Sequence, residues 1–199
     1  MSQAPLYEPV VLSPQPPNDP RIASLIWWAA RLSELGFTPS YGPGDHGNLS
    51  CRTSTGLLIS ARETEKARLQ PDQFVDVVAK DVSQAGSGPV RIACRGPRLP
   101  STDAWMHLRI YGLRPDIHAI LHGHDRAALA NAAALRLPIT TCSAAAPSRS
   151  LVDEVCELAK SYDYLLMRDH GFLALGASID EAGELARRVN ASARSAGER

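Results

Sequence analysis

The sequence predicts a mixed α/β fold. Segments with the alternating pattern of strands are interspersed with segments of helical periodicity, and some predicted strands follow one another directly as pairs. The chain has 199 residues, of which 44% are hydrophobic and 21% charged, and a chain of this kind can bury a sizeable core. Because there is no internal repeat and no sign of a second domain, we expect residues 20–199 to form one domain.

The beginning of the chain divides into an arm and a helix. Residues 1–19 are rich in proline and polar groups, so we expect an extended N-terminal arm rather than a domain. Asp19 is the expected N-cap of the helix that follows, and Pro20 lies in its first turn. Apolar residues then recur on one face of this helix until Gly36 ends it.

The remaining elements follow from periodicity and from turn and capping residues. Further strands are expected at residues 48–52, 57–60, 74–79, 90–94, 117–124, 139–142, 163–167 and 172–175. Further helices are expected at residues 104–113, 126–135 and 151–161 and from residue 178 onward. Residues 53–56 join the first two of these strands as a hairpin, Asp125 caps an alanine-rich helix, and Ser178 with Glu181 forms a capping box.

Charge and composition exclude several kinds of partner. The chain has 21 basic and 21 acidic residues and a formal net charge of zero, which gives no electrostatic basis for binding nucleic acid or an anionic membrane. No apolar run approaches the length of a membrane span. The four cysteines lack the close spacing of a thiolate metal site, and with no secretory signal we expect reduced thiols in a cytoplasmic protein.

Three histidines give the strongest functional indication. His122 and His124 end an apolar run that predicts a strand, and residues two apart on a strand face the same way. His170 follows 46 positions beyond His124 and precedes a glycine. Three imidazoles can hold a catalytic zinc ion with one position open. The alternative is that each is an ordinary hydrogen-bonded histidine, but the combined pattern favours a metal site.

Four motifs carry a resemblance to a known family. They are Gly47-Asn48 with the strand that follows, residues 99–103 followed by His107, Arg114-Pro115-Asp116 leading into His122-Gly123-His124, and residues 170–176. In this order, the motifs make residues 21–190 resemble the class II aldolase/adducin family, which includes sugar-phosphate aldolases, ribulose-5-phosphate 4-epimerases and methylthioribulose-1-phosphate dehydratase. The resemblance implies a three-layer αβα fold with a central, largely antiparallel sheet.

The resemblance also implies roles for individual residues. His122, His124 and His170 would bind zinc or a similar divalent ion, which polarises a hydroxy-ketone and stabilises the enediolate. Asp103 stands where the family's aldolases carry a proton-transferring glutamate and its epimerases an aspartate. The alternative for Asp103 is a simple helix N-cap. His107, one helical turn later, is expected to orient Asp103.

A substrate-binding shell is expected beside the metal. In the family the residues matching Asn48, Ser101 and Thr102 hold the substrate phosphate, although such residues are also common as caps and in turns. This chain departs from the family at residues 60–64, where Ser-Ala-Arg-Glu-Thr replaces a small glycine turn that wraps the phosphate. We expect Arg62 to bind a phosphate or carboxylate there, whereas Glu63 would repel a phosphate if it pointed inward.

A second departure concerns tyrosine. Family members often supply a proton-donating tyrosine from a neighbouring subunit or the C-terminal tail, and residues 139–150 and 177–199 contain none. His46 and His118 are expected to be structural, with His118 hydrogen-bonded in the core.

The sequence therefore predicts a cytoplasmic, zinc-dependent lyase of the aldolase type that acts on a small anionic hydroxy-carbonyl or sugar-phosphate compound. A sugar-phosphate 4-epimerase or a decarboxylase on the same fold is the alternative within this class. An adducin-like binding module without catalysis is the alternative of another class, and the complete histidine triad favours an enzyme. The family further implies a homo-oligomer, expected to be a tetramer.

Overall fold

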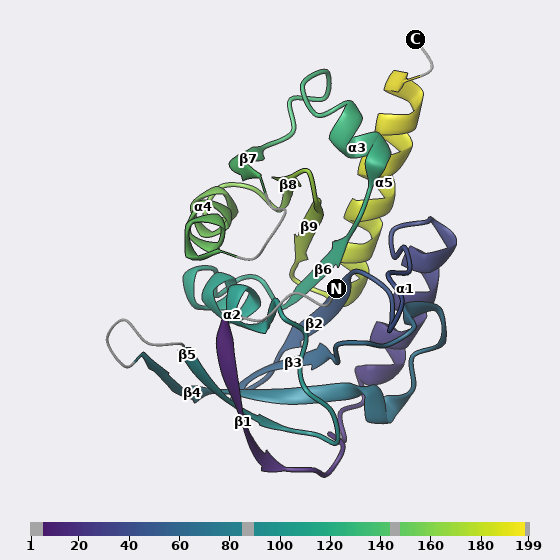
Figure 1. The fold of residues 1–199 in the computed structure, drawn as a ribbon. Coiled ribbons are helices and arrows are strands. Elements are labelled where there is room, and N and C mark those ends of the chain that lie inside the picture. Colours follow the sequence, from purple (N-terminus) through teal and green to yellow (C-terminus); the bar gives the residue numbers. More distant parts are fainter. Residues whose placement is uncertain (1–5, 85–89, 144–147, 198–199) are drawn as a thin grey trace.

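A nine-stranded sheet forms the centre of the molecule in the computed structural model, which describes residues 6–84, 90–143 and 148–197 (Figure 1). The strands are β1 (Tyr7–Ser13), β2 (Asn48–Arg52), β3 (Gly56–Ser60), β4 (Phe74–Gln84), β5 (Val90–Arg95), β6 (Ala119–Gly123), β7 (Ile139–Ser143), β8 (Tyr164–Arg168) and β9 (Gly171–Gly176). Their order is β1-β5-β4-β3-β2-β6-β9-β8-β7. Only the β1–β5 and β7–β8 pairs are parallel among the described strands, so the predicted, largely antiparallel sheet is confirmed.

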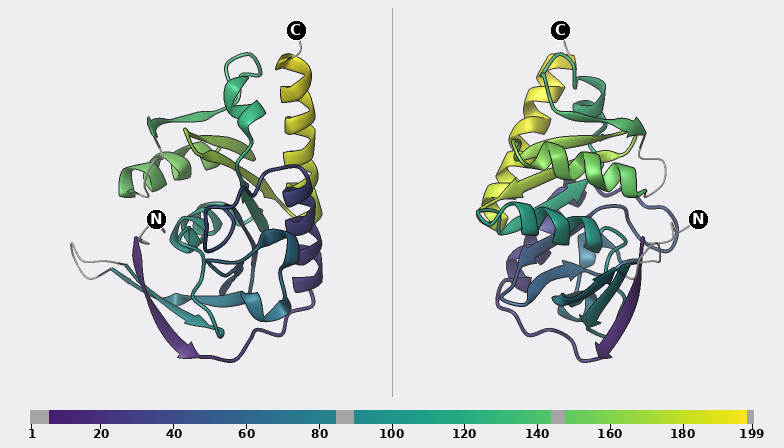
Figure 2. Two further views of the ribbon diagram at one scale, coloured as in Figure 1. Left: turned by 45° about the vertical axis from the view of Figure 1, so that its right-hand side comes forward. Right: turned by 90° about the vertical axis from the view of Figure 1, so that its left-hand side faces the viewer.

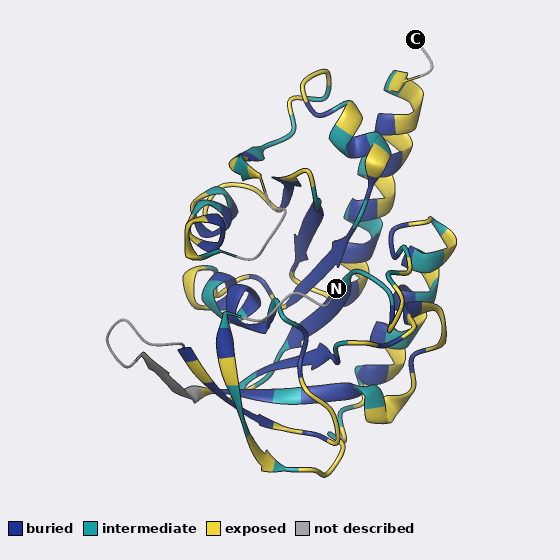
Figure 3. Cartoon of the chain, viewed as in Figure 1, coloured by how far each residue is buried: buried dark blue, intermediate teal, exposed yellow. Residues whose placement is uncertain are grey.

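Helices cover both faces of this sheet (Figure 2). The helices are α1 (Ile22–Glu34), α2 (Ala104–Leu113), α3 (Arg126–Ala130), α4 (Arg149–Ala159) and α5 (Ile179–Gly197), with short 3-10 turns at Lys66–Arg68 and Pro71–Gln73. Helices α2 and α4 bury one apolar cluster, which includes Trp105 and Val155. Helices α1, α3 and α5 bury a second cluster on the opposite face, around Trp28. The strands between them are mostly buried (Figure 3), as expected for a sheet covered on both faces.

Most predicted elements are present, with shifts at their ends. Helix α1 begins at Ile22, because the Asp19 carboxylate accepts a hydrogen bond from the Arg21 backbone N–H in a turn before the helix. Gly36, at φ +80°, ends α1 as predicted. Helix α3 is shorter than the predicted 126–135, and turns replace its second half. There the backbone N–H and the side chain of Asn131 both donate to the Ala127 carbonyl, and the side chain also donates to the Ala193 carbonyl of α5 at 3.2 Å.

The N-terminal arm is not separate from the sheet. Its backbone is extended as predicted, but Tyr7–Ser13 pairs in parallel with β5 and forms an edge strand of the central sheet. Pro9 is compatible with an edge position, since a missing N–H costs nothing on the unpaired side of the strand. The proline-rich composition therefore did not indicate the strand that residues 7–13 form.

Two glycines allow the strand ends to approach each other closely. A Cβ atom at Gly47, which has φ +86°, would lie 2.8 Å from the His122 carbonyl oxygen. A Cβ atom at Gly171 would lie 2.2 Å from the carbonyl oxygen of Gly123. Because β6 pairs with β2 on one side and with β9 on the other, these contacts gather the motifs of β2, β6 and β9 at one end of the sheet.

Candidate active site

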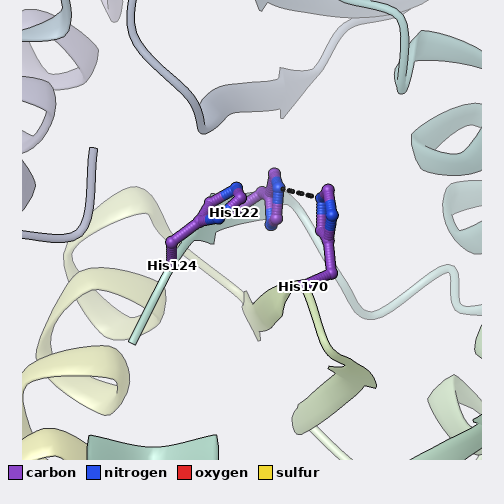
Figure 4. Close-up of side chains that lie close together, drawn as sticks. All are labelled: His122, His124 and His170. Carbon is purple, nitrogen blue, oxygen red and sulfur yellow. Dashed lines mark hydrogen bonds between the residues drawn. The ribbon is translucent and has the colours of Figure 1, made fainter. Parts of the chain in front are cut away.

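Three histidines converge at this end of the sheet (Figure 4). His122 lies near the end of β6, His124 follows β6, and His170 lies in the turn between β8 and β9. The ring centroids of His122 and His170 are 5.1 Å apart and those of His124 and His170 are 4.6 Å apart. One nitrogen from each ring lies within 4.8 Å of the others. The structure therefore brings together the three residues that the sequence predicts as metal ligands.

The orientation of the rings suits a divalent ion. His122 Nδ1 is 2.8 Å from the Phe172 carbonyl oxygen, so it donates and leaves the lone pair on Nε2. That Nε2 is 3.2 Å from His170 Nε2, and two nitrogens bound to one tetrahedral zinc ion would lie about 3.3 Å apart. His124 Nε2 is buried and has no hydrogen-bond partner among the described residues. The donor set therefore fits a metal ion.

Burial favours the neutral form of two of these imidazoles, those of His122 and His124. Burial lowers the pKa of His124 to about 2, with a further contribution from the neighbouring histidines. The pKa of His122 is also lowered, chiefly by burial, although Asp103 opposes this shift. Neutral imidazole is the form that binds a metal ion, so the lowered pKa values of His122 and His124 favour metal binding at neutral pH.

Asp103 lies beside the histidines, and its side chain does not cap the helix. It occupies the N-cap position of α2 but makes no side-chain capping hydrogen bond. Instead its Oδ2 accepts a hydrogen bond of 2.7 Å from Asn48 Nδ2. Burial raises the pKa of Asp103, but nearby histidines, led by His122, and the Asn48 hydrogen bond outweigh burial and leave the pKa below its usual range. The group is thus an ionised carboxylate beside the histidines.

All eight predicted site residues line one cavity of about 220 Å³. They are His122, His124, His170, Asp103, Asn48, Ser101, Thr102 and Arg62. Asn48 is 3% exposed, and its Oδ1 has no partner in the part of the chain that the structure describes. The cavity thus presents imidazole nitrogens, a carboxylate, hydroxyls, a guanidinium and an unpaired amide oxygen within a small volume.

Comparison with known proteins identifies the family. The family model described as the class II aldolase and adducin N-terminal domain matches residues 28–196. The chain belongs to this family.

Relatives with assigned names are enzymes of sugar-phosphate chemistry. A 5-methylthioribulose-1-phosphate/5-deoxyribulose-1-phosphate aldolase of Escherichia coli O45:K1 is 27% identical over 155 residues, 69% of this chain and 67% of that protein. A methylthioribulose-1-phosphate dehydratase of Pseudoalteromonas translucida is 29% identical over 111 residues, 56% of this chain. The latter match spans only 46% of the relative's length.

Solved structures of aldolases share the fold. An L-fuculose 1-phosphate aldolase has a TM-score of 0.72 at 24% identity, covering 90% of this chain and 85% of its own. The L-fuculose-1-phosphate aldolase from Thermus thermophilus has a TM-score of 0.68 at 24% identity, covering 87% of this chain and 91% of its own. At this level of identity the likeness concerns the fold alone, and it confirms the predicted class II aldolase architecture.

The segment that departs from the family pattern forms part of the cavity wall. Glu63 adopts φ 56°, in the left-handed region where glycine is favoured, so the backbone keeps a glycine-like turn without glycine. Glu63 is exposed and also lines the cavity. Arg62 donates from Nε to the Pro100 carbonyl at 3.1 Å, and its Nη2 is buried without a partner among the described groups.

Four further residues line the cavity without having been predicted as site residues: Tyr41, Asp45, His46 and Lys66. The His46 ring lies between the rings of Tyr41 and His124, at 4.6 Å from each centroid. The buried Lys66 ammonium donates to both oxygens of Thr64 and to the Asp45 carbonyl, and burial lowers its pKa to about 8. His46 directly precedes the Gly47-Asn48 motif, which was the only available signal in the sequence.

Two other histidines differ from their expected surroundings. His107 Nδ1 lies 2.8 Å from the Ser50 hydroxyl, and the described hydrogen bonds to the Asp103 carboxylate come from Asn48 rather than from His107. His118 is exposed, so the predicted core position is wrong. It directly precedes β6, where its backbone bonds to Gly176 and Arg52 and its neighbours Ile117 and Ala119 are buried, so that only its side chain reaches the surface.

Proposed function

We propose that this chain is a metal-dependent lyase of the aldolase type, acting on a small anionic hydroxy-carbonyl compound. The observation that carries the proposal is the shared cavity of three imidazoles and the Asp103 carboxylate. Such a combination provides a site for an electrophilic ion beside a group that transfers protons. The binding module without catalysis is less well supported, because it gives no reason for this combination.

We further propose that His122, His124 and His170 hold the ion and that it is zinc. Three nitrogen ligands with a fourth position open are typical of catalytic zinc. When bound, such an ion withdraws electron density from a substrate carbonyl. The Phe172 carbonyl would support the site by fixing the tautomer and orientation of His122.

Asp103 would carry the proton transfer. As an ionised carboxylate it can accept a proton from a substrate hydroxyl or from the carbon next to a carbonyl. Asn48 would hold it in position through the 2.7 Å hydrogen bond. The free Oδ1 of Asn48 would at the same time accept a hydrogen bond from a substrate hydroxyl, which would satisfy an otherwise unpaired buried oxygen.

An anionic group of the substrate would bind at the part of the cavity wall formed by Arg62, Ser101 and Thr102. Arg62 supplies a guanidinium, and Ser101 and Thr102 supply hydroxyls at the start of α2. Phosphate is the group carried by the named substrates of the E. coli and Pseudoalteromonas relatives. A carboxylate is compatible with the same wall, since Glu63 at the rim disfavours a dianion.

Incubation with a substrate panel tests the activity. The metal-loaded protein is incubated separately with 5-methylthioribulose 1-phosphate, 5-deoxyribulose 1-phosphate, L-fuculose 1-phosphate and phosphate-free hydroxy-acids, and products are followed by mass spectrometry. Aldol cleavage gives two smaller carbonyl compounds, whereas epimerisation conserves mass, dehydration loses water and decarboxylation loses carbon dioxide. The proposal fails if no compound is converted faster than by the Asp103→Asn variant.

A further inference from the structure

The first strand brings a buried tyrosine to the wall of the cavity. Tyr7 opens β1, is 2% exposed, and lies outside residues 28–196, which the family model matches. Its hydroxyl is 2.7 Å from the Ser101 carbonyl oxygen and 3.0 Å from that of Pro100. These are the backbone groups that precede Thr102 and Asp103 in the cavity wall. Tyr7 therefore joins the N-terminal strand to the active-site segment.

The same hydroxyl lies beside Arg62. Burial raises the pKa of Tyr7 far above its usual range, and the charge and a side-chain hydrogen bond of Arg62 partly oppose this rise. The Nε of Arg62 donates to the Pro100 carbonyl, which is one of the two acceptors of the tyrosine. The guanidinium and the hydroxyl are thus held against one shared backbone group.

Tyr7 acts at a point where two cavity segments are already paired. Ala61 and Pro100 form an isolated antiparallel bridge. The Arg62 N–H donates to the Leu99 carbonyl at 3.2 Å, and the Ser101 N–H donates to the Ser60 carbonyl at 3.3 Å. Arg62 and Ser101 belong to these two segments, so a group bound to both fixes their relative positions.

We propose that Tyr7 is a positioning residue for the anion-binding wall, which makes the N-terminal strand β1 a part of the active site. The inference rests on the proposed function, because it takes Arg62 and Ser101 as the groups that bind the substrate anion. The hydroxyl of Tyr7 holds the guanidinium in place and ties the Ser101 segment to β1. Tyr7 is not among the residues that line the cavity, so it acts through these groups and not on the substrate.

The effect of the hydroxyl can be separated from folding. In Tyr7→Phe the ring remains in the apolar cluster of β1, β5 and α2. The Ser101 carbonyl still accepts the Ala104 N–H at 3.0 Å, and the Pro100 carbonyl still accepts Arg62 Nε. Neither carbonyl therefore loses its only donor, and we expect the variant to fold.

Calorimetric titration with 2-phosphoglycolate tests the proposal, using the 199-residue protein with its metal. This probe carries a phosphate and a carboxylate. We expect Tyr7→Phe to raise its Kd about fivefold, since a misplaced guanidinium forfeits part of a charged hydrogen bond. Arg62→Ala should raise the Kd more, and Tyr7→Phe should add almost nothing in the Arg62→Ala background.

Tyr164→Phe is the matched control. Tyr164 is buried at 6% exposure, and its hydroxyl has no partner among residues that the structure describes. Its substitution should leave the Kd unchanged.

Three results would overturn the inference. The first is an unchanged Kd in Tyr7→Phe together with a raised Kd in Arg62→Ala. It would show that the tyrosine only stabilises the fold, and it would leave the proposed anion site intact. Fully additive effects in the double variant would show that Tyr7 does not act through Arg62. An unchanged Kd in Arg62→Ala would remove both the anion site and the inference built on it.

Discussion

The sequence allows two roles for Asp103, a helix N-cap or a proton-transferring carboxylate, and its hydrogen bond from Asn48 favours the second. An aspartate that follows Ser-Thr and precedes a helix is a common N-cap, but this carboxylate accepts its hydrogen bond from Asn48 on β2. Ser101 Oγ instead accepts a hydrogen bond of 3.3 Å from the Asp103 N–H. The Asp103 carboxylate thus makes no capping bond to α2 and lies beside the histidines in the cavity.

Replacement of Asp103 tests its proposed role. Asp103→Asn should keep the fold and the metal but lower kcat on the order of 10²-fold or more, because an amide cannot accept the proton. Asp103→Glu is the matched control and should retain part of the activity, since it keeps the carboxylate. The measurements are kcat, metal content and the melting temperature. An unchanged kcat with only a lower melting temperature would support the helix-cap alternative instead.

At the scale of elements, the sequence predicts most of the helices and strands but not every boundary. Strand pairs such as β2 and β3 were recognisable because alternating apolar residues flank an obvious turn. Strand β1 was missed because Pro9 and a half-exposed edge position remove the alternation on which such predictions rely. The loop before β2 was also unpredictable, since its shape depends on the distant contact between Asp45 and Lys66.

Asp125 gives a test at this scale, because one side chain joins two helices. Its carboxylate accepts the Ala128 N–H at 3.0 Å at the start of α3, and it accepts Asn190 Nδ2 of α5 at 2.9 Å. Asp125→Ala removes the cap and leaves a buried amide unpaired, so we expect a loss of about 2 kcal/mol or more in the free energy of unfolding.

Urea denaturation measures this loss, and Asp125→Asn is the control. The asparagine still offers an oxygen to the Ala128 N–H, so its loss should be smaller. Metal content should stay the same in both variants, since Asp125 does not line the cavity. Equal stability of Asp125→Ala and the unsubstituted protein would contradict the described role of the cap.

At the scale of the whole molecule, the fold assembles one site from segments far apart in the chain. The cavity combines residues from the β2, β6 and β9 ends with the segments around Arg62 and Ser101. The family motifs allowed these groups to be predicted together, because each motif falls at a strand or helix end. Tyr41, Asp45, His46 and Lys66 were not predicted as site residues, because only the three-dimensional path of their loops brings them to the cavity. No helix within the described ranges has the length and apolar character required to cross a membrane.

The oligomeric state is a property of the whole molecule that can be tested. We expect a homotetramer in solution, because closed symmetric oligomers are the default for enzymes of this kind. Large apolar side chains on the surface of the single chain, such as Trp27 at 57% and Val11 at 51% exposure, are consistent with contacts between subunits. Light scattering coupled to size-exclusion chromatography should give a mass near four chains at micromolar concentration. A stable monomer under these conditions would contradict the prediction.

Metal content tests the central claim most directly. The unsubstituted protein is equilibrated with zinc and desalted. Inductively coupled plasma mass spectrometry should then find about one zinc ion per chain. His122→Ala, His124→Ala and His170→Ala should each lose most of the metal while circular dichroism shows a folded protein. His118→Ala should retain it, because that histidine is exposed and does not line the cavity. Retention of the ion by the triple variant, or failure of the unsubstituted protein to bind zinc, would contradict the assignment of the three histidines as ligands.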